Sequence, residues 1–181
     1  PNQLPIITTK PELRSNIGTY IMARKIDYEP HKLITQYRMH ERICDAVNAL
    51  RRALNTYPLR PADAVRQRDL TRLGYEWIED NCPEDFREIL NTREPCIIIN
   101  TDNLPDFEEI GFGQSKLYRA EAILAAKLAK IIYQSFINEN TNEHLKPVIL
   151  SPYSAQVGFI KELLAGTPLQ DRCLTIYQSQ G

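Results

Sequence analysis

The sequence predicts an α/β fold in which a mainly parallel sheet is flanked by helices. Continuous apolar runs at residues 96–99, 148–150 and 173–176 are typical of strands buried on both faces, and residues 33–35 favour a further strand. Longer segments with apolar residues at helical spacing alternate with these runs, which indicates β-α-β units. With 181 residues, the chain is long enough for one such domain and an appended arm.

The expected helices follow from the spacing of apolar residues. One begins near Glu41 and runs for about four turns, until the prolines from Pro58 onward end it. The longest is expected over 115–137 and another over 155–164, while a weaker pattern favours a helix over 11–25. Each lies before or after a predicted strand, as the α/β interpretation requires.

Residues 60–94 differ from the rest of the chain in being rich in charge. They hold two weakly amphipathic stretches that Pro83 separates. A segment of this kind offers little apolar surface to a sheet. We therefore expect an irregular surface arm or insertion outside the core.

Composition narrows the class of protein. The net charge of −1 provides no global positive field that would attract nucleic acid. Net charge does not, however, report a local positively charged channel. The sequence contains no run of 18 apolar residues, so it predicts no membrane-spanning helix. The cysteines form no C-x-x-C pair, which favours free thiols over a metal site or disulfides. Free thiols are typical of a reducing compartment, so we expect an intracellular protein, cytoplasmic or nuclear.

Polar residues follow three of the predicted strands, at the carboxyl ends where open parallel sheets bind ligands. They are Q-Y-R-M-H at 36–40, S-P-Y-x-x-Q at 151–156 and Q-S-Q-G at 178–181. Their donors suit phosphate, and the tyrosines could stack on a base. Taken singly, these residues also have ordinary explanations: Arg38 as a surface or ion-pair residue, Tyr37 as a core aromatic, and Ser151-Pro152 as a plain turn.

The order of these motifs is more specific than any one of them. Together they resemble superfamily 1 helicases, and more narrowly the 5′→3′ branch that contains the nonsense-mediated-decay helicase. The opening P-N-Q-L-P fits the third motif of that family. The resemblance implies a RecA-like parallel sheet. Residues 1–32 would be the end of a first RecA-like domain and a linker, and 33–181 an incomplete second motor domain with an arm at about 60–94.

The resemblance implies half of an ATP site. The matching residues are Gln3, Gln36, Tyr37, Arg38, Gln180 and Gly181. Gln3 and Arg38 match the catalytic residues at the γ-phosphate, where a permanently charged, planar guanidinium suits the charge that develops during phosphoryl transfer. Tyr37 matches the residue that stacks on adenine, and Gln36 would support that pocket. Met39 and His40 are expected to pack against and cap the helix that follows, rather than to contact ligand. Gln180 and Gly181 match the pair that leads the chain back to the nucleotide.

The resemblance also implies a track for single-stranded DNA or RNA. The matching residues are Ser151, Tyr153, Gln156 and Thr175. We expect Ser151, Tyr153 and Thr175 at the carboxyl ends of neighbouring strands, on one edge of the sheet. Contacts of this kind go to the strand backbone and position it without reading its sequence. Contacts to the 2′-hydroxyl, which distinguish RNA from DNA, cannot be identified from the sequence. The chain departs from the family at Tyr118, where an asparagine is usual, and at Tyr177 within the fifth motif.

Two family elements are missing. The sequence contains no G-x-x-x-x-G-K-[ST] loop and no Asp-Glu pair after a strand. We therefore expect the chain to run from the third to the fifth motif of a larger protein and to be inactive alone. ATP and Mg²⁺ would be bound mainly by the first RecA-like domain of the same protein. The alternatives are a degenerate helicase-like module that binds nucleic acid or protein without turnover, and an NTPase that remodels complexes without unwinding.

Overall fold

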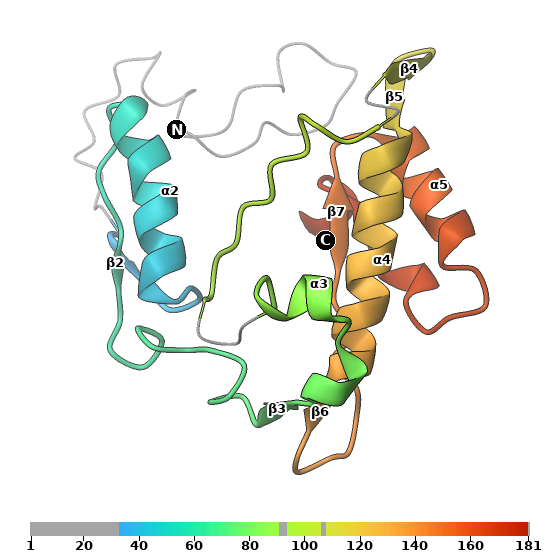
Figure 1. The fold of residues 1–181 in the computed structure, drawn as a ribbon. Helices are drawn as coiled ribbons and strands as arrows, with labels where there is room; N and C mark the ends of the chain where they lie inside the picture. Colours follow the sequence, from blue (N-terminus) through green and yellow to red (C-terminus); the bar gives the residue numbers. More distant parts are fainter. Residues whose placement is uncertain (1–32, 91–93, 106–107, 181) are drawn as a thin grey trace. The chain divides into compact units, whose positions relative to one another are not determined.

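The computed structural model describes residues 33–90, 94–105 and 108–180 (Figure 1). The chain divides into two units after Ile34, and every helix and strand named below belongs to the second unit. The helix predicted over 11–25 lies outside the described residues. The predicted domain bounds stay a prediction.

Three long helices match the predicted ones in place. They are α2 (Glu41–Ala53), α4 (Arg119–Ser135) and α5 (Ser154–Leu163). Helix α2 ends before Pro58 is reached, because the chain turns at Asn55, whose φ of 51° is a left-handed conformation that asparagine tolerates. Among the helices of the described ranges, none is both long and apolar enough to cross a membrane.

The described strands pair two by two. The parallel pairs are β1 (Thr35–Gln36) with β2 (Arg60–Pro61), and β7 (Ile149–Ser151) with β8 (Cys173–Thr175). The antiparallel pairs are β3 (Tyr75–Trp77) with β6 (Phe136–Asn138), and β4 (Glu109–Phe112) with β5 (Ser115–Tyr118). The shorter helices are α3 (Glu84–Arg87) and the 3-10 turns η2 (Glu79–Asn81), η3 (Gln170–Arg172) and η4 (Gln178–Gln180). The chain is thus an α/β protein with small parallel sheets.

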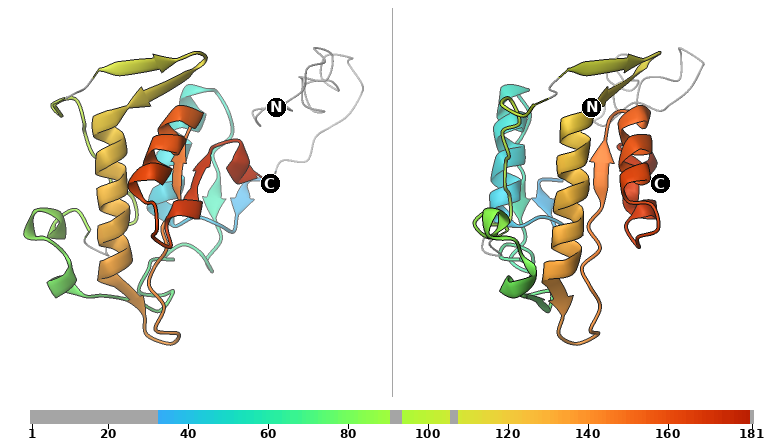
Figure 2. Two further views of the ribbon diagram at one scale, coloured as in Figure 1. Left: turned by 90° about the vertical axis from the view of Figure 1, so that its right-hand side faces the viewer. Right: turned by 45° about the vertical axis from the view of Figure 1, so that its right-hand side comes forward.

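The helix predicted over 115–137 is shorter in the structure because strands take both of its ends. Residues before α4 form β5, which folds back on β4 through the two-residue turn of Gly113 and Gln114. Gly113 has a φ of 61°, which glycine adopts without strain. Residues after α4 form β6, which pairs with β3. The hairpin of β4 and β5 leads directly into α4 (Figure 2).

Helix α4 contributes to two buried clusters. The first joins its alanines to α5, which lies beside it (Figure 2); its buried members include Ala122, Ala126, Ala129, Val157, Ile160 and Leu164. Small alanine side chains let the two helix backbones approach closely. The second cluster joins Ile131 to residues of the charged segment and of β6: Cys82, Phe86, Leu90 and Phe136. Helix α4 therefore organises the described core.

The prediction that residues 60–94 lie outside the core is wrong for four of them, of which Val65 is 3% exposed. Cys82, Phe86 and Leu90 are buried in the second cluster. The charged residues around them hid this pattern: α3 is only four residues long, so its single buried side chain, Phe86, produces no visible helical period. This part of the segment is an integral part of the fold.

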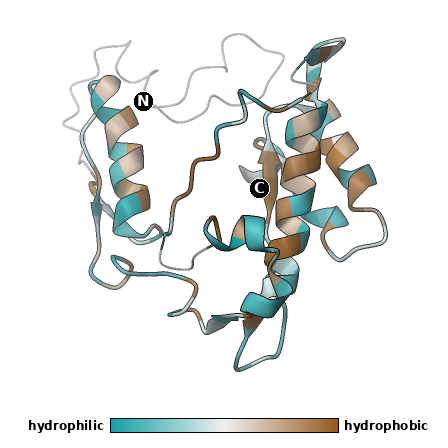
Figure 3. Cartoon of the chain, viewed as in Figure 1, coloured by the Kyte–Doolittle hydropathy of each residue, from teal (hydrophilic) through white to brown (hydrophobic). Residues whose placement is uncertain are grey.

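The prediction of a buried strand at residues 96–99 is also wrong. This run has no strand pairing, and Ile98 is 91% exposed. Figure 3 shows the run as strongly apolar along an irregular trace. Apolar composition indicates only a local preference, whereas a strand needs a neighbouring backbone to pair with, and the described strands pair with one another instead.

Candidate functional site

The parallel pair of β7 and β8 places two predicted site residues side by side. Ser151 stands opposite Thr175 in the register, at the carboxyl end of each strand. The backbone N–H of Ile176 donates to the carbonyl oxygen of Ser151 at 3.1 Å and extends the pairing past the strand ends. The predicted placement of Ser151 and Thr175 at one sheet edge is confirmed. Their role there is not tested by this geometry.

The hydroxyl groups at this edge shape the loops that follow the strands. Ser151 Oγ accepts a hydrogen bond from the backbone N–H of Tyr153 at 3.2 Å. Thr175 and Gln178 bond reciprocally: Gln178 Oε1 accepts from the backbone N–H of Thr175 at 2.9 Å, and Thr175 Oγ1 accepts from that of Gln178 at 3.2 Å. Thr175 Oγ1 also donates to Gln178 Oε1 at 3.1 Å. A phosphate bound by this hydroxyl would have to replace Gln178 as its acceptor.

The β4–β5 hairpin is fixed to the first turn of α5. Ser115 Oγ accepts a hydrogen bond from the backbone N–H of Ala155 at 2.9 Å. Gln156 is only 6% exposed, and its Oε1 accepts from the backbone N–H of Tyr118 at 2.8 Å. The structure therefore gives Gln156 the role of a tether between two helix starts. Its predicted contact with a nucleic acid stays a prediction.

A cavity of about 440 Å³ opens where the hairpin and the two strand ends meet. Three aromatic residues line it, one from each segment: Phe112, Tyr153 and Tyr177. Two serines and a threonine line it as well: Ser115, Ser154 and Thr175. The lining, which Gln114 and Pro152 complete, carries no charged side chain.

A charged cluster lies on the hairpin next to this cavity. Lys116 Nζ lies 2.8 Å from Glu109 Oε1, and Tyr118 donates its hydroxyl to the same carboxylate. The hydrogen bond from Lys116 lowers the pKa of Glu109, and the same contact raises the pKa of Lys116. Lys116 Nζ also lies 6.0 Å from the centre of the Tyr153 ring. The positive charge beside the cavity is therefore paired with a carboxylate.

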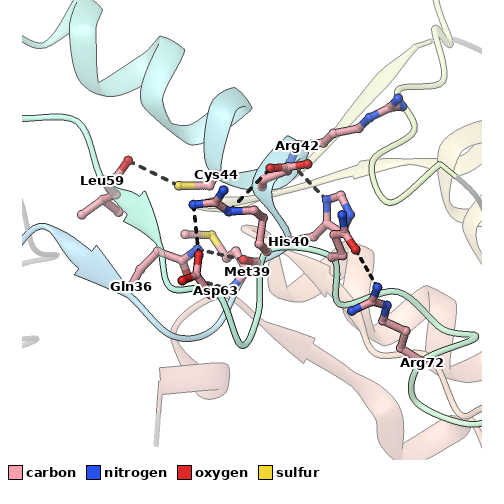
Figure 4. A network of polar contacts seen from close by, with 11 residues as sticks. Gln36, Met39, His40, Arg42, Cys44, Leu59, Asp63 and Arg72 are labelled. Atoms are coloured by element: carbon pink, nitrogen blue, oxygen red, sulfur yellow. Dashed lines mark hydrogen bonds and ion pairs between the residues drawn. The ribbon is translucent and has the colours of Figure 1, made fainter.

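The Q-Y-R-M-H loop after β1 is closed by its first residue (Figure 4). Gln36 Oε1 accepts from the backbone N–H groups of Arg38 at 2.8 Å and Met39 at 2.6 Å, and Gln36 Nε2 donates to the Met39 carbonyl at 2.8 Å. His40 caps α2, because its Nδ1 accepts from the backbone N–H of Arg42 at 3.1 Å. This confirms the capping role predicted for His40.

The loop presents its two central side chains to solvent. Tyr37 is 71% exposed, and Arg38 is exposed as well. Arg38 also borders a second, mainly apolar cavity of about 560 Å³ together with Leu73, Leu90 and Phe136. Gln3, Gly181 and the side chain of Gln180 lie outside the described residues.

Sequence reasoning missed the hairpin and therefore four residues of the site. Phe112, Gln114, Ser115 and Lys116 were assigned to a loop or to the start of the long helix. A usable signal exists: Gly113 stands at the first position of a two-residue turn, between Ile110 and Phe112 on one side and Ser115 and Leu117 on the other. Gly-x between alternating residues is typical of a tight hairpin.

Comparisons with known proteins give one match. Searches against curated proteins and against solved structures found no match. Among protein families, residues 17–181 match the AAA domain family, and this range includes the loop after β1 and the edge of β7 and β8. Because the match extends over most of the sequence, the chain belongs to the AAA domain family, a helicase-like group within the P-loop NTPase superfamily.

Proposed function

We propose that this chain is part of an ATP-dependent nucleic-acid helicase or translocase of the 5′→3′ branch of superfamily 1. It acts as the second RecA-like motor domain and supplies part of a single-strand track and half of an ATP site. One observation carries the proposal: Ser151 and Thr175 stand in register at the carboxyl ends of two parallel strands, beside a cavity with aromatic and hydroxyl walls.

On the track, the donors of Ser151, Tyr153 and Thr175 meet the backbone of single-stranded DNA or RNA. Hydroxyl and amide donors suit phosphate oxygens, and such contacts hold any sequence equally well. The short register between β7 and β8 keeps Ser151 and Thr175 adjacent, so they contact neighbouring parts of one strand. Domain opening and closing around ATP then moves the strand.

At the nucleotide, the loop after β1 offers two exposed groups of the required chemistry. The Tyr37 ring can stack on adenine, and the Arg38 guanidinium can reach a γ-phosphate held by another domain. The described residues contain no cluster of three metal-ligating side chains. We assign Mg²⁺, with most of the phosphate contacts, to the first RecA-like domain of the same protein. Gln3, Gln180 and Gly181 complete the site by the family pattern.

Thr175→Val is expected to weaken binding of single-stranded nucleic acid by about 10- to 150-fold, since a hydrogen bond to a charged group is worth about 1.5–3 kcal/mol. The loss should be equal for strands of different sequence, and the salt dependence should fall only slightly. Fluorescence anisotropy across a salt titration measures both. Thr141→Val, in the exposed loop after β6, is the matched control. Unchanged binding by Thr175→Val would make Thr175 a structural residue of its turn.

Tyr37→Ala is expected to weaken ATP binding by about 1–3 kcal/mol, the range found for base–aromatic stacking. Tyr37→Phe keeps the ring and should bind ATP as the unchanged protein does. Calorimetric titration of the complete motor with a non-hydrolysable ATP analogue measures the difference. Equal affinities for all three proteins would remove Tyr37 from the proposed adenine site.

A further inference from the structure

We propose that the cavity at the edge of β7 and β8 accepts an unpaired nucleobase of the bound strand, stacked against Phe112 and Tyr177. The inference rests on the proposed function and adds a site to it. The chain would then hold its strand by a base as well as by the backbone.

The two rings are available for stacking. Phe112 is 52% exposed and Tyr177 is 50% exposed, yet both line the same cavity. Large aromatic side chains left half-exposed around a concavity offer apolar faces to a flat ligand. Phe112 comes from the hairpin and Tyr177 from the loop after β8, so the cavity depends on both segments.

The absence of charge from the lining decides between a base and a phosphate. A phosphate inside the cavity would meet only neutral groups, and Lys116 beside it is already paired with Glu109. A nucleobase is neutral and planar, with donors and acceptors on its edge. Gln114 offers both a donor and an acceptor. Ser154 donates its hydroxyl to Ser115 Oγ at 3.3 Å, so Ser154 still offers an acceptor and Ser115 a donor. The phosphates then remain at the rim.

The volume of the cavity and the rigidity of its walls both suit a nucleobase. The cavity of about 440 Å³ lies within the range of about 300–1,000 Å³ that is usual for small ligands. Its walls are fixed to one another, because Ser115 bonds to Ala155 and the strand ends pair through Ser151 and Ile176. A preformed site loses less entropy on binding than one that must be assembled. Stacking with hydrogen bonds from adaptable side chains predicts little sequence preference.

The test uses the full chain and an oligothymidylate strand in which a fluorescent purine analogue is placed at each position in turn. One position should show quenching, and Phe112→Ala and Tyr177→Ala should each abolish it. Each variant should also weaken binding about 5- to 150-fold, as expected for one lost stack. Leu50→Ala, which removes an exposed apolar side chain from α2, is the control and should bind as the unchanged chain does.

A change in the ligand provides a second test that leaves the protein intact. An abasic nucleotide at the responsive position should weaken binding by a similar factor, and Phe112→Ala should cause no further loss on that strand. If neither substitution nor the abasic nucleotide changed the affinity for single-stranded nucleic acid, the base site would be overturned. The proposed function would then still stand. Failure of the unchanged chain to bind any strand would overturn both.

Discussion

Arg38→Ala is expected to lower nucleic-acid-stimulated ATP hydrolysis by the complete motor at least about 100-fold, with ATP affinity within about tenfold of normal. In the proposed ATP site, the guanidinium would act mainly when charge develops on the γ-phosphate, so its loss should affect turnover more than ground-state binding. Arginines in this position are worth about 10³ to 10⁵ in rate, and sharing the task with another arginine reduces the effect. In the structure, Gln36 fixes the backbone of Arg38 and the Arg38 side chain is exposed, as the proposed role requires.

Steady-state ATPase assays with saturating single strand, paired with nucleotide titrations, separate the two effects. Arg38→Lys should not restore turnover, because an ammonium group lacks the planar fork of donors. Arg52→Ala, an exposed arginine in the last turn of α2, is the matched control. Near-normal turnover by Arg38→Ala would show that the Q-Y-R-M-H loop is structural and would remove the main support for the ATP half of the proposal.

Phe86→Ala is expected to destabilise the chain by about 3–5 kcal/mol, the usual cost of removing a buried phenyl ring. Phe86 is packed with Cys82, Leu90 and Ile131, and Lys127 Nζ lies 4.7 Å from the ring centre. Urea denaturation measures the change in the free energy of unfolding. Phe112→Ala, which removes the same side chain from an exposed position, should cost no more than about 0.5 kcal/mol. If both variants lost equally little free energy of unfolding, the segment around Phe86 would be a surface arm, as the sequence predicted.

The sequence was most informative where a single element carries its own signal. Helices α2 and α5 have enough turns for their apolar spacing to be read, and His40 could be identified as a cap from its place before α2. The edge formed by Ser151 and Thr175 could be predicted because Ser151 directly follows one apolar run and Thr175 lies near the end of another, and parallel strands end at the same edge.

The remaining features depend on partners that are distant in the sequence. Residues 96–99 have the composition of a strand but no paired neighbour, and α3 is too short to show a period although Phe86 is buried. Gln156 was expected at a nucleic acid, yet its amide oxygen is engaged by the backbone of Tyr118, 38 positions earlier. Only the three-dimensional fold shows which donor bonds to the amide oxygen of Gln156.

The tether at Gln156 also has an electrostatic consequence. It joins the first turn of α5 to the residue that precedes α4, so the amino-terminal ends of two helices lie together beside the cavity. Each helix dipole places about half a positive charge at that end. Glu121 offsets part of it in α4, whereas the first turn of α5 contains no acidic residue. The cavity lining is neutral and the net charge of the chain is −1, yet the helix ends give a local positive potential that attracts a polyanion such as nucleic acid. Salt screens this potential over about 10 Å at 0.1 M.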